Sequence, residues 1–136
     1  MVKIIAITMI ILETKINMIL QIAPVSKPRM TRADRWKKRQ SVLKFFAFRD
    51  AVRQYCETHA IAWWSFEIEF HVPMPKSWSK KKKILHNGKP HNQTPDLDNF
   101  LKAWKDSVFK EDSVVWRVHA CKLWTSGPGH IIVRDL

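Results

Sequence analysis

The chain has 136 residues, which is the length of one domain, and 46% of them are hydrophobic, so it can bury a core of its own. Its 24 basic residues against 12 acidic ones give a formal net charge of +12, which is typical of a domain that binds a polyanion such as nucleic acid. Cys56 and Cys121 lie far apart and outside any zinc-binding spacing. This argues against a disulfide framework or a zinc knuckle and favours two reduced, partly buried thiols.

The first elements of the chain are an apolar run and a short strand. Residues 4–12 are apolar but too few to span a bilayer, and no small-residue cleavage site follows them. We interpret residues 1–17 as an N-terminal extension of unassigned role, either an extra edge strand or a segment upstream of a functional start at Met18. The domain then comprises residues 18–136. Residues 18–23 are expected to form a short buried strand that ends at Pro24.

A long helix is predicted after the proline-punctuated basic segment 24–32. Asp34 is a suitable N-cap, and the helix is expected to run from about residue 35 to about residue 59. Its apolar stripe is expected to contain Val42, Phe45, Phe46, Ala47, Val52 and Tyr55. Residues 66–72 then alternate between apolar and polar side chains, with Phe66, Ile68, Phe70 and Val72 on one face, which predicts a half-exposed strand.

The second half of the chain contains a basic loop, a helix and two strands. Residues 76–94 are polar and basic and are expected to form an exposed, mobile loop with at most a short helical turn. A helix is expected at about 98–109, followed by strands at about 114–124 and 131–134. Strands mixed with two helices without regular alternation indicate an α+β fold. We therefore expect a single compact domain in which a small mixed β-sheet packs with two main helices.

The acidic residues are few, so a cluster of them stands out. Asp96 and Asp98 flank Leu97 where the second helix begins, and Pro95 favours an extended lead-in, in which residues two apart point the same way. Asp112 follows the helix and can reach the same point only if the next strand runs back beside this lead-in. Carboxylate oxygens are ligands of Mg²⁺, which activates water and neutralises phosphate charge. The structural alternatives are a helix cap at Asp98 and turn chemistry at Asp96.

Basic side chains complete the pattern of a nuclease. Lys102 lies four residues after Asp98 on the same helix face, where it can form an ion pair with Asp98 or contact the scissile phosphate or a metal-bound water. Phosphate contacts that do not read bases are expected from Lys27, Arg29, Arg32, Lys76, Lys80, Lys81, Lys82 and Lys83. Arg35, Lys37, Lys38 and Arg39 extend the first of these basic groups. The alternative for each group is an ordinary solvated surface.

The tryptophans are expected to pack in the core, with two exceptions. Trp78 lies in the basic loop, and it or Trp36 could stack on unpaired bases of a bound nucleic acid. The six histidines show no zinc-ligand spacing.

Four stretches carry a resemblance to a known family. Residues 95–102, Pro95-Asp96-Leu97-Asp98-Asn99-Phe100-Leu101-Lys102, resemble the P-D-x-D-N-x-x-K signature of the RusA family of Holliday junction resolvases. Lys27-Pro28-Arg29 is similar to the family's opening segment, and residues 75–83 are similar to the basic loop that precedes the signature in phage-type members. Residues 111–115 are similar to the family's D-D-x-x-V element. The resemblance covers about residues 18–134.

The resemblance implies a homodimeric endonuclease that depends on Mg²⁺, for which Mn²⁺ can substitute, and that places paired nicks across a four-way DNA junction in recombination and repair. It implies that Asp96, Asp98 and Asp112 bind the metal and that Lys102 is the essential basic residue. Glu111 replaces the first Asp of the family's acidic pair, so we assign the role to Asp112 and keep Glu111 as the alternative. It further implies no small-molecule cofactor, no membrane, and a place at the nucleoid in the cytoplasm of a bacterial or phage-infected cell.

Other functions remain open at this point. One is a non-catalytic, structure-selective DNA-binding protein that keeps the fold and the basic surface, and another is a nuclease for other branched or flapped DNA. Binding to an anionic membrane is weaker, because no basic amphipathic helix with a long apolar face stands out. The combination of Asp96, Asp98, Lys102 and Asp112 argues for catalysis, and metal-dependent cleavage distinguishes the first two functions.

Overall fold

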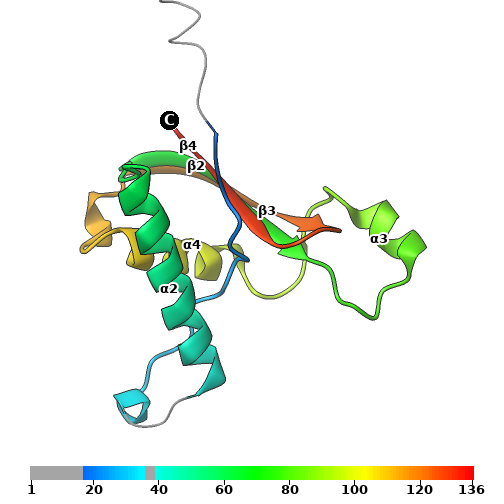
Figure 1. The fold of residues 1–136 in the computed structure, drawn as a ribbon, viewed down its shortest axis with the longest axis horizontal. Helices are drawn as coiled ribbons and strands as arrows, with labels where there is room; N and C mark the ends of the chain where they lie inside the picture. The colour runs from blue at the N-terminus through cyan, green and yellow to red at the C-terminus, as the bar shows by residue number, and fades with distance from the viewer. Residues whose placement is uncertain (1–16, 36–38) are drawn as a thin grey trace, which may run out of the picture.

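A computed structural model of the chain describes residues 17–35 and 39–136 (Figure 1). The expectations for residues 1–16 and for Trp36, Lys37 and Lys38 therefore lie outside the described residues. The first elements are β1 (Met18–Leu20), the 3₁₀ helix η1 (Arg32–Arg35), α2 (Gln40–Thr58) and β2 (Ser65–Pro73). They are followed by α3 (Lys80–His86), α4 (Leu97–Val108), η2 (Asp112–Val114), β3 (Arg117–Thr125) and β4 (His130–Asp135).

The four strands form one mixed sheet in the order β1-β4-β2-β3. β2 and β3 pair in parallel, whereas β4 is antiparallel to both β1 and β2. Parallel neighbours need a crossover connection, and here the crossover contains both α3 and α4. The α+β class with a small mixed sheet is confirmed, and α3 adds a third helix to the two predicted ones.

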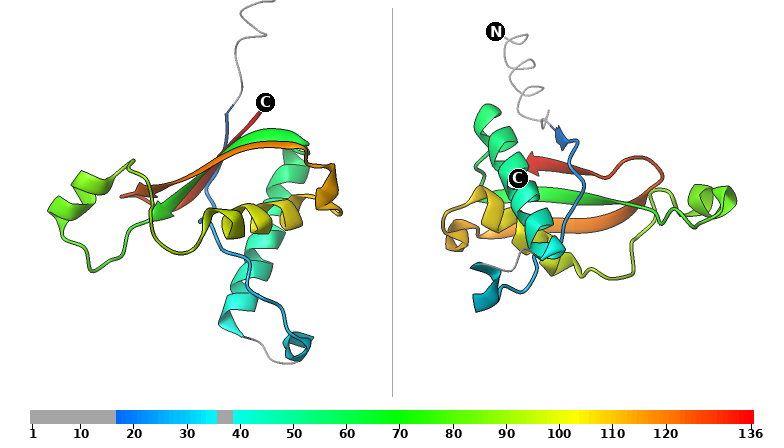
Figure 2. Two further views of the ribbon diagram at one scale, coloured as in Figure 1. Left: turned by 180° about the vertical axis from the view of Figure 1, so that it is seen from behind. Right: turned by 60° about the horizontal axis from the view of Figure 1, so that its bottom comes forward.

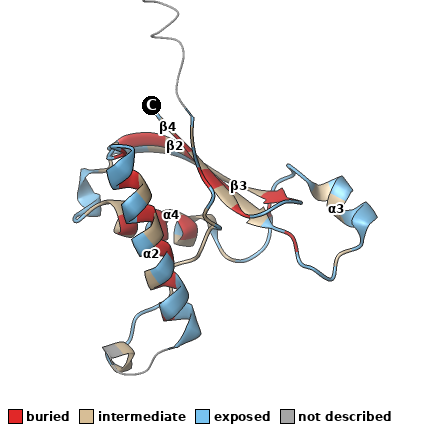
Figure 3. Cartoon of the chain, in the orientation of Figure 1, coloured by how far each residue is buried: buried red, intermediate tan, exposed pale blue. Residues whose placement is uncertain are grey.

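The core lies between the sheet and the two longer helices. α2 and α4 cross each other against one face of the sheet, while α3 projects from its opposite end (Figures 1 and 2). Phe66, Ile68 and Phe70 of β2 are buried on that face, as the alternation predicts, and Trp104 of α4 packs beside Phe66 with ring centroids 6.5 Å apart. Burial is concentrated in this layer, and α3 contributes no buried residue (Figure 3).

Polar side chains cover the other face of the sheet. The guanidinium of Arg134 on β4 donates a hydrogen bond to Glu69 and forms an ion pair with Glu67 on β2, each at 3.0 Å. Burial alone would raise the pKa of Glu69, but the hydrogen bonds from Arg134 and His71 outweigh it and hold that pKa below its ordinary value. The sheet is therefore buried on one side only, which explains why β2 alternates in sequence.

Helix α2 begins later than predicted. The carboxylate of Asp34 does not cap it, because it accepts hydrogen bonds from the Thr31 backbone N–H and the Arg39 guanidinium. These contacts lower the pKa of Asp34 to about 2, with the Arg39 hydrogen bond as the largest cause. With Asp34 bound to Thr31 and Arg39, the helix starts at Gln40, and Arg39 takes the N-cap position.

The buried stripe of α2 also differs from the prediction. Phe48 is buried and Ala47 is exposed. The buried positions are Val42, Phe45, Phe48, Val52 and Cys56, which follow a spacing of three and four residues. Strand β1 is shorter than predicted, since only three of its residues pair with β4. The physical reason is the length of the partner strand: Leu20 pairs with Ile131, and β4 begins only one residue earlier, at His130.

Candidate active site

Asp96 and Asp98 stand at the start of α4. Asp96 occupies the N-cap position with an extended backbone, φ −66° and ψ 151°, and its side chain makes no capping hydrogen bond. Asp98 lies inside the first turn, so it is not the cap of this helix. Both residues are exposed. Neither of the structural roles that the sequence allowed therefore accounts for this pair of carboxylates.

The charge of these two carboxylates is not neutralised by the described part of the chain. Most other acidic side chains have a cation beside them: Asp34 pairs with Arg39, Asp106 with Lys27, and Glu67 and Glu69 share Arg134. The ion pairs among the described residues include neither Asp96 nor Asp98. The N-terminus of a helix also favours negative charge. The pair is thus available to a cation from solution.

The segment that leads into Asp96 lies beside the end of β3. The His91 N–H donates to the Lys122 carbonyl at 3.0 Å, and Pro90 forms an antiparallel bridge with Leu123. The ammonium group of Lys122 donates to the carbonyls of Gln93 and Pro95, the latter at 2.7 Å. The next strand does run back beside the lead-in, as the sequence argument required, but the residue it brings there is Lys122.

Lys122 was not identified from the sequence. It belongs to no motif, and a lysine on a half-exposed strand gives no signal of its own. Its role follows only from the pairing of β3 with the residues before Asp96.

Asp112 lies at the other end of α4. Its carboxylate is 4.0 Å from the ammonium group of Lys105, near the C-terminus of the helix. A helix of 12 residues is about 18 Å long at 1.5 Å per residue. Among the described residues no group of three or more His, Cys, Asp or Glu side chains is placed to hold a metal ion. Within one chain, Asp96 and Asp98 are together, whereas Asp112 and Glu111 are apart from them.

A basic hollow borders the first half of α4, on the side that carries Asn99 and Lys102. It has a volume of about 430 Å³ and is lined by Lys27, Pro28, Arg29, Met30, Asn99 and Lys102. The backbone N–H of Lys27 donates to the Asn99 carbonyl at 3.3 Å, and its ammonium group pairs with Asp106. Lys102 is exposed and forms no ion pair with Asp98. The structure therefore brings the basic segment 27–29 and Lys102 to one hollow, next to the carboxylate pair.

The other predicted DNA-binding residues lie in two places. Arg32 is exposed on η1 and follows Arg29, a lining residue of the basic hollow, by three residues. Lys76 and the four lysines of α3 belong to a separate projection, in which Lys80, Lys81 and Lys82 are exposed and Lys83 is half-buried. These predicted DNA-binding residues therefore lie in two separate basic regions of the described chain, in line with their two groups in the sequence.

Trp78 has a different environment from the predicted one. Its ring lies 4.8 Å from the ring of Trp124 and 5.1 Å from that of His86, and the ammonium group of Lys82 sits 4.2 Å from its centroid. The ring of Trp78 is therefore surrounded by other side chains of the protein. Such packing favours a structural role for Trp78 over stacking on DNA bases.

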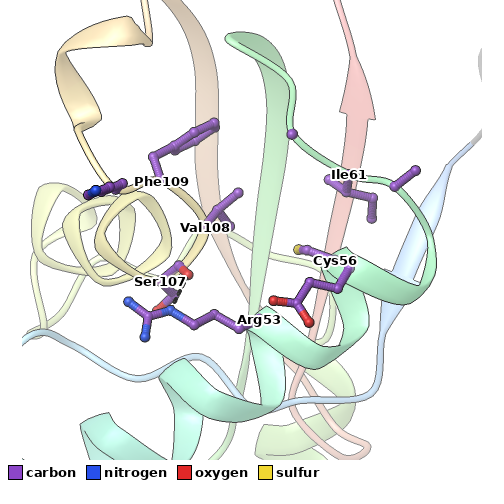
Figure 4. Close-up of a pocket in the computed structure, with 10 residues that line it drawn as sticks. Arg53, Cys56, Ile61, Ser107, Val108 and Phe109 are labelled. Atoms are coloured by element: carbon purple, nitrogen blue, oxygen red, sulfur yellow. Dashed lines mark hydrogen bonds between the residues drawn. The ribbon is translucent and has the colours of Figure 1, made fainter.

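A larger hollow, of about 540 Å³, lies away from the carboxylates, between the C-terminal parts of α2 and α4 (Figure 4). Arg53 reaches across it and donates to the Ser107 carbonyl at 3.0 Å. Cys56 lines it, and burial raises the pKa of this thiol to about 12, so it is not a nucleophile at neutral pH. Both cysteines are free, as the sequence predicts.

No helix in the described ranges 17–35 and 39–136 is long and apolar enough to cross a membrane.

Comparison with protein-family models matches the endodeoxyribonuclease RusA family over residues 21–134 of the 136. No curated protein matches the chain. The match contains the carboxylate pair, Lys102, the basic hollow and the strand that carries Lys122. RusA enzymes are endodeoxyribonucleases that resolve Holliday junctions. With its signature at residues 95–102 at the start of α4, the chain belongs to the RusA endodeoxyribonuclease family.

Proposed function

We propose that this chain is a metal-dependent endonuclease that resolves Holliday junctions and related branched DNA by paired phosphodiester hydrolysis. The observation that carries the proposal is the exposed, unpaired carboxylate pair of Asp96 and Asp98 beside a basic hollow that contains Lys102. A basic surface attracts DNA, but two bare carboxylates would repel a phosphate unless a cation lies between them. Membership of the RusA family supports the same reaction.

The donor set fits Mg²⁺, with Mn²⁺ as a substitute. Asp96 and Asp98 offer only hard oxygen ligands, and magnesium is commonly held by one or two carboxylates, with waters and substrate phosphate completing its coordination. When bound, the metal lowers the pKa of a coordinated water and neutralises charge on the phosphate. No small-molecule cofactor is needed for this hydrolysis.

The chain's own basic residues position the substrate. Lys27 is engaged with Asp106, which leaves Arg29 and Lys102 in the basic hollow to bind phosphate oxygens. Lys102 is one turn along the helix from Asp98, so its ammonium group can donate to the phosphate next to the carboxylate pair. Charge that develops on the phosphate during hydrolysis would be stabilised by this donor.

A second copy of the chain is part of the proposal. Because Asp112 is distant from Asp96 within one chain, we propose that it, with Glu111 as the alternative, serves as third metal ligand in the site of a partner copy. Two exposed tryptophans support such an interface: Trp64 and Trp116 are 59% and 70% exposed, and the Trp116 N–H donates to the Trp64 carbonyl at 3.0 Å. They adjoin η2, which carries Asp112. Exposed aromatic patches of this kind are typical of protein interfaces.

The deciding experiment is a cleavage assay on a labelled four-way junction, with a linear duplex of the same sequence as control. Wild type is compared with Asp96→Asn, in Mg²⁺ and in EDTA. We expect paired, symmetric nicks in the junction alone, and their loss with EDTA or with Asp96→Asn while junction binding persists.

Two other outcomes would replace the proposal. Tight junction binding without cleavage in Mg²⁺ or Mn²⁺ would make the chain a structure-selective DNA-binding protein. Faster cleavage of flapped DNA than of the junction would make it a nuclease for that substrate. The proposed reaction places the protein with the DNA of a bacterial or phage-infected cell, in the cytoplasm, which imaging of a tagged copy over the nucleoid would test.

A further inference from the structure

The segment of residues 76–91, which we name the α3 arm, projects from the end of the sheet, away from α2 and from the C-terminus of α4 (Figures 1 and 2). It contains α3, whose seven residues begin with four lysines and continue with Ile84 and Leu85. None of these seven residues is buried. Helix α3 therefore contributes no side chain to the main core, which suggests that it contacts another molecule.

The arm is firmly attached at its base. The Gly88 N–H donates to the Trp124 carbonyl and the Trp124 N–H donates to the Lys89 carbonyl, both at 2.9 Å. The ring of His91, which is 3% exposed, packs 4.2 Å from that of Trp124. Asn87 also accepts a hydrogen bond from the Ser126 N–H at 3.0 Å. These contacts fix the arm to the end of β3, so its tip is presented in a defined position.

One side of α3 faces this base and the other faces solvent. Lys82 and His86, one turn apart, both contact the ring of Trp78. Ile84 lies on the opposite side of a helix whose residues advance by 100° each. Ile84 is 74% exposed and Leu85 is 61% exposed, and Ile84 is the most exposed large apolar side chain among the described residues. Two adjacent apolar side chains thus stand at the tip of an arm with four lysines.

We propose that Ile84 and Leu85 form an apolar wedge that inserts between bases at the branch point of the DNA, while the lysines of α3 bind the flanking phosphates. This inference rests on the proposed function, whose substrate is branched DNA. Proteins that kink DNA insert apolar side chains such as Ile and Leu between base steps. Opening a stack costs least where the regular duplex is already interrupted, as it is where the four arms of a junction meet. The charge of the arm complements the DNA on either side.

The test uses a four-way junction that carries the fluorescent base 2-aminopurine at the branch point, because its fluorescence rises when the base is unstacked. Binding is measured in EDTA, so that no cleavage occurs, for wild type and for the double variant Ile84→Ser/Leu85→Ser. At saturating protein, the wild type is expected to raise the fluorescence about twofold or more, and the double variant to leave it nearly unchanged. The double variant should bind the junction about tenfold more weakly and a linear duplex within about twofold of wild type.

Two control variants distinguish insertion of Ile84 and Leu85 between bases from the loss of any exposed apolar side chain or of positive charge. Leu43→Ser changes an apolar side chain of α2 that is 40% exposed and lies outside the arm, and it should leave the fluorescence unchanged from wild type. Lys80→Ala/Lys81→Ala should weaken binding to junction and duplex alike, with a smaller salt dependence, but should give the wild-type fluorescence at saturation. Ile84→Phe/Leu85→Phe, which keeps large apolar side chains at both positions, should give a rise in fluorescence like that of wild type.

Three results would overturn the wedge. One is an equal rise in fluorescence for wild type and Ile84→Ser/Leu85→Ser at saturation. Another is a signal at an internal duplex position as large as at the branch. The third is a halved molecular mass of the double variant in light scattering, which would assign these side chains to contact with a second copy. Cleavage of the junction by wild type in Mg²⁺ is measured in parallel, so that failure of the wedge alone is distinguished from failure of the proposed function.

Discussion

Lys122 is the side chain through which β3 reaches the candidate active site. Its ammonium group holds the carbonyls of Gln93 and Pro95, the second of which immediately precedes Asp96. The position of Asp96 therefore depends on a residue that contacts neither metal nor DNA in the proposed mechanism. A group that orients a metal ligand in this way commonly affects metal affinity or activity by 10- to 100-fold, as a general order of magnitude.

We expect Lys122→Met to reduce junction cleavage by about 10- to 100-fold and to raise the Mg²⁺ concentration needed for half-maximal activity. Lys122→Arg should restore much of the activity, because it keeps a cation that donates to both carbonyls. The measurement is a Mg²⁺ titration of the cleavage rate, with thermal unfolding as a check on folding. An unchanged Mg²⁺ requirement in Lys122→Met would exclude this positioning role.

Lys102 and Lys105 allow a matched comparison on one helix. Lys102 lines the basic hollow, whereas Lys105 lies beside Asp112. We expect Lys102→Ala to lower the cleavage rate by about 10²- to 10³-fold at saturating junction, because a donor to the transition state is lost. Lys105→Ala should have a much smaller effect on this rate if the dimer forms normally. Single-turnover kinetics would check both predictions. Equal losses of cleavage rate in the two variants would mean that Lys102 contributes only its positive charge and not a specific donor to the transition state.

At the scale of the element, the α3 arm shows how a basic stretch without periodicity becomes an ordered projection. The sequence indicated a mobile loop, since lysines, Gly88 and Pro90 are typical of one. The structure adds Ser79, whose hydroxyl accepts a hydrogen bond from the Lys82 N–H and caps α3. It also adds the pairing of the return segment with β3, which no local pattern reveals.

His91 makes the base of this arm sensitive to acid. Burial, with the charge of Lys122 as a second cause, lowers the pKa of His91 below its ordinary 6.5, and its Nδ1 has no partner among the described residues. The folded state therefore holds a neutral ring at pH values where the unfolded state binds a proton. The free energy of unfolding should then fall as the pH drops below about 6.5, by at most about 1.4 kcal/mol per pH unit for this group.

We expect His91→Phe to lose this part of the pH dependence, since Phe keeps the contact with Trp124 and cannot bind a proton. Urea unfolding of wild type and variant at pH 7.5 and pH 5.5 provides the measurement, and the other histidines cancel in the comparison. Equal pH dependence of the two proteins would show that His91 is not responsible.

At the scale of the whole molecule, the two basic regions and the separated carboxylates favour a dimer. One chain supplies Asp96 and Asp98 at the start of α4 and Asp112 at its other end. Resolution of a junction requires two cuts on opposing strands, which two sites in a symmetric dimer can provide. The exposed Trp64 and Trp116 adjoin Asp112, so the proposed interface and the proposed third ligand belong to one region.

Mixed dimers test whether Asp112 acts in the partner's site. If it does, Asp96→Asn and Asp112→Asn are each inactive alone, but a heterodimer of the two carries one intact site and one doubly altered site. Co-refolding the two variants should then restore nicking of one strand, without paired cuts. If Asp112 serves the site of its own chain, the mixture stays inactive, and mixing with wild type controls for exchange of subunits.

Much of the fold and part of the site could be predicted from the sequence because they depend on short-range patterns. The alternation in β2, the apolar face of α4 and the proline before Asp96 each act within a few residues, and the structure confirms the elements that they predict. The start of α2 could not be predicted, because Arg39 captures the expected cap, Asp34, through a contact between side chains, whereas its end at Thr58 agrees with the prediction.

The sequence by itself determined the class of the protein: a basic α+β domain with a paired carboxylate at a helix start, in the RusA family. Only the tertiary structure decided which distant residues meet. It placed Lys122 against the lead-in to Asp96, brought Lys27 and Arg29 to the hollow of Lys102, and kept Asp112 at the far end of α4. The reason is physical: helix length and strand pairing set these distances, and neither is encoded in the spacing of a motif.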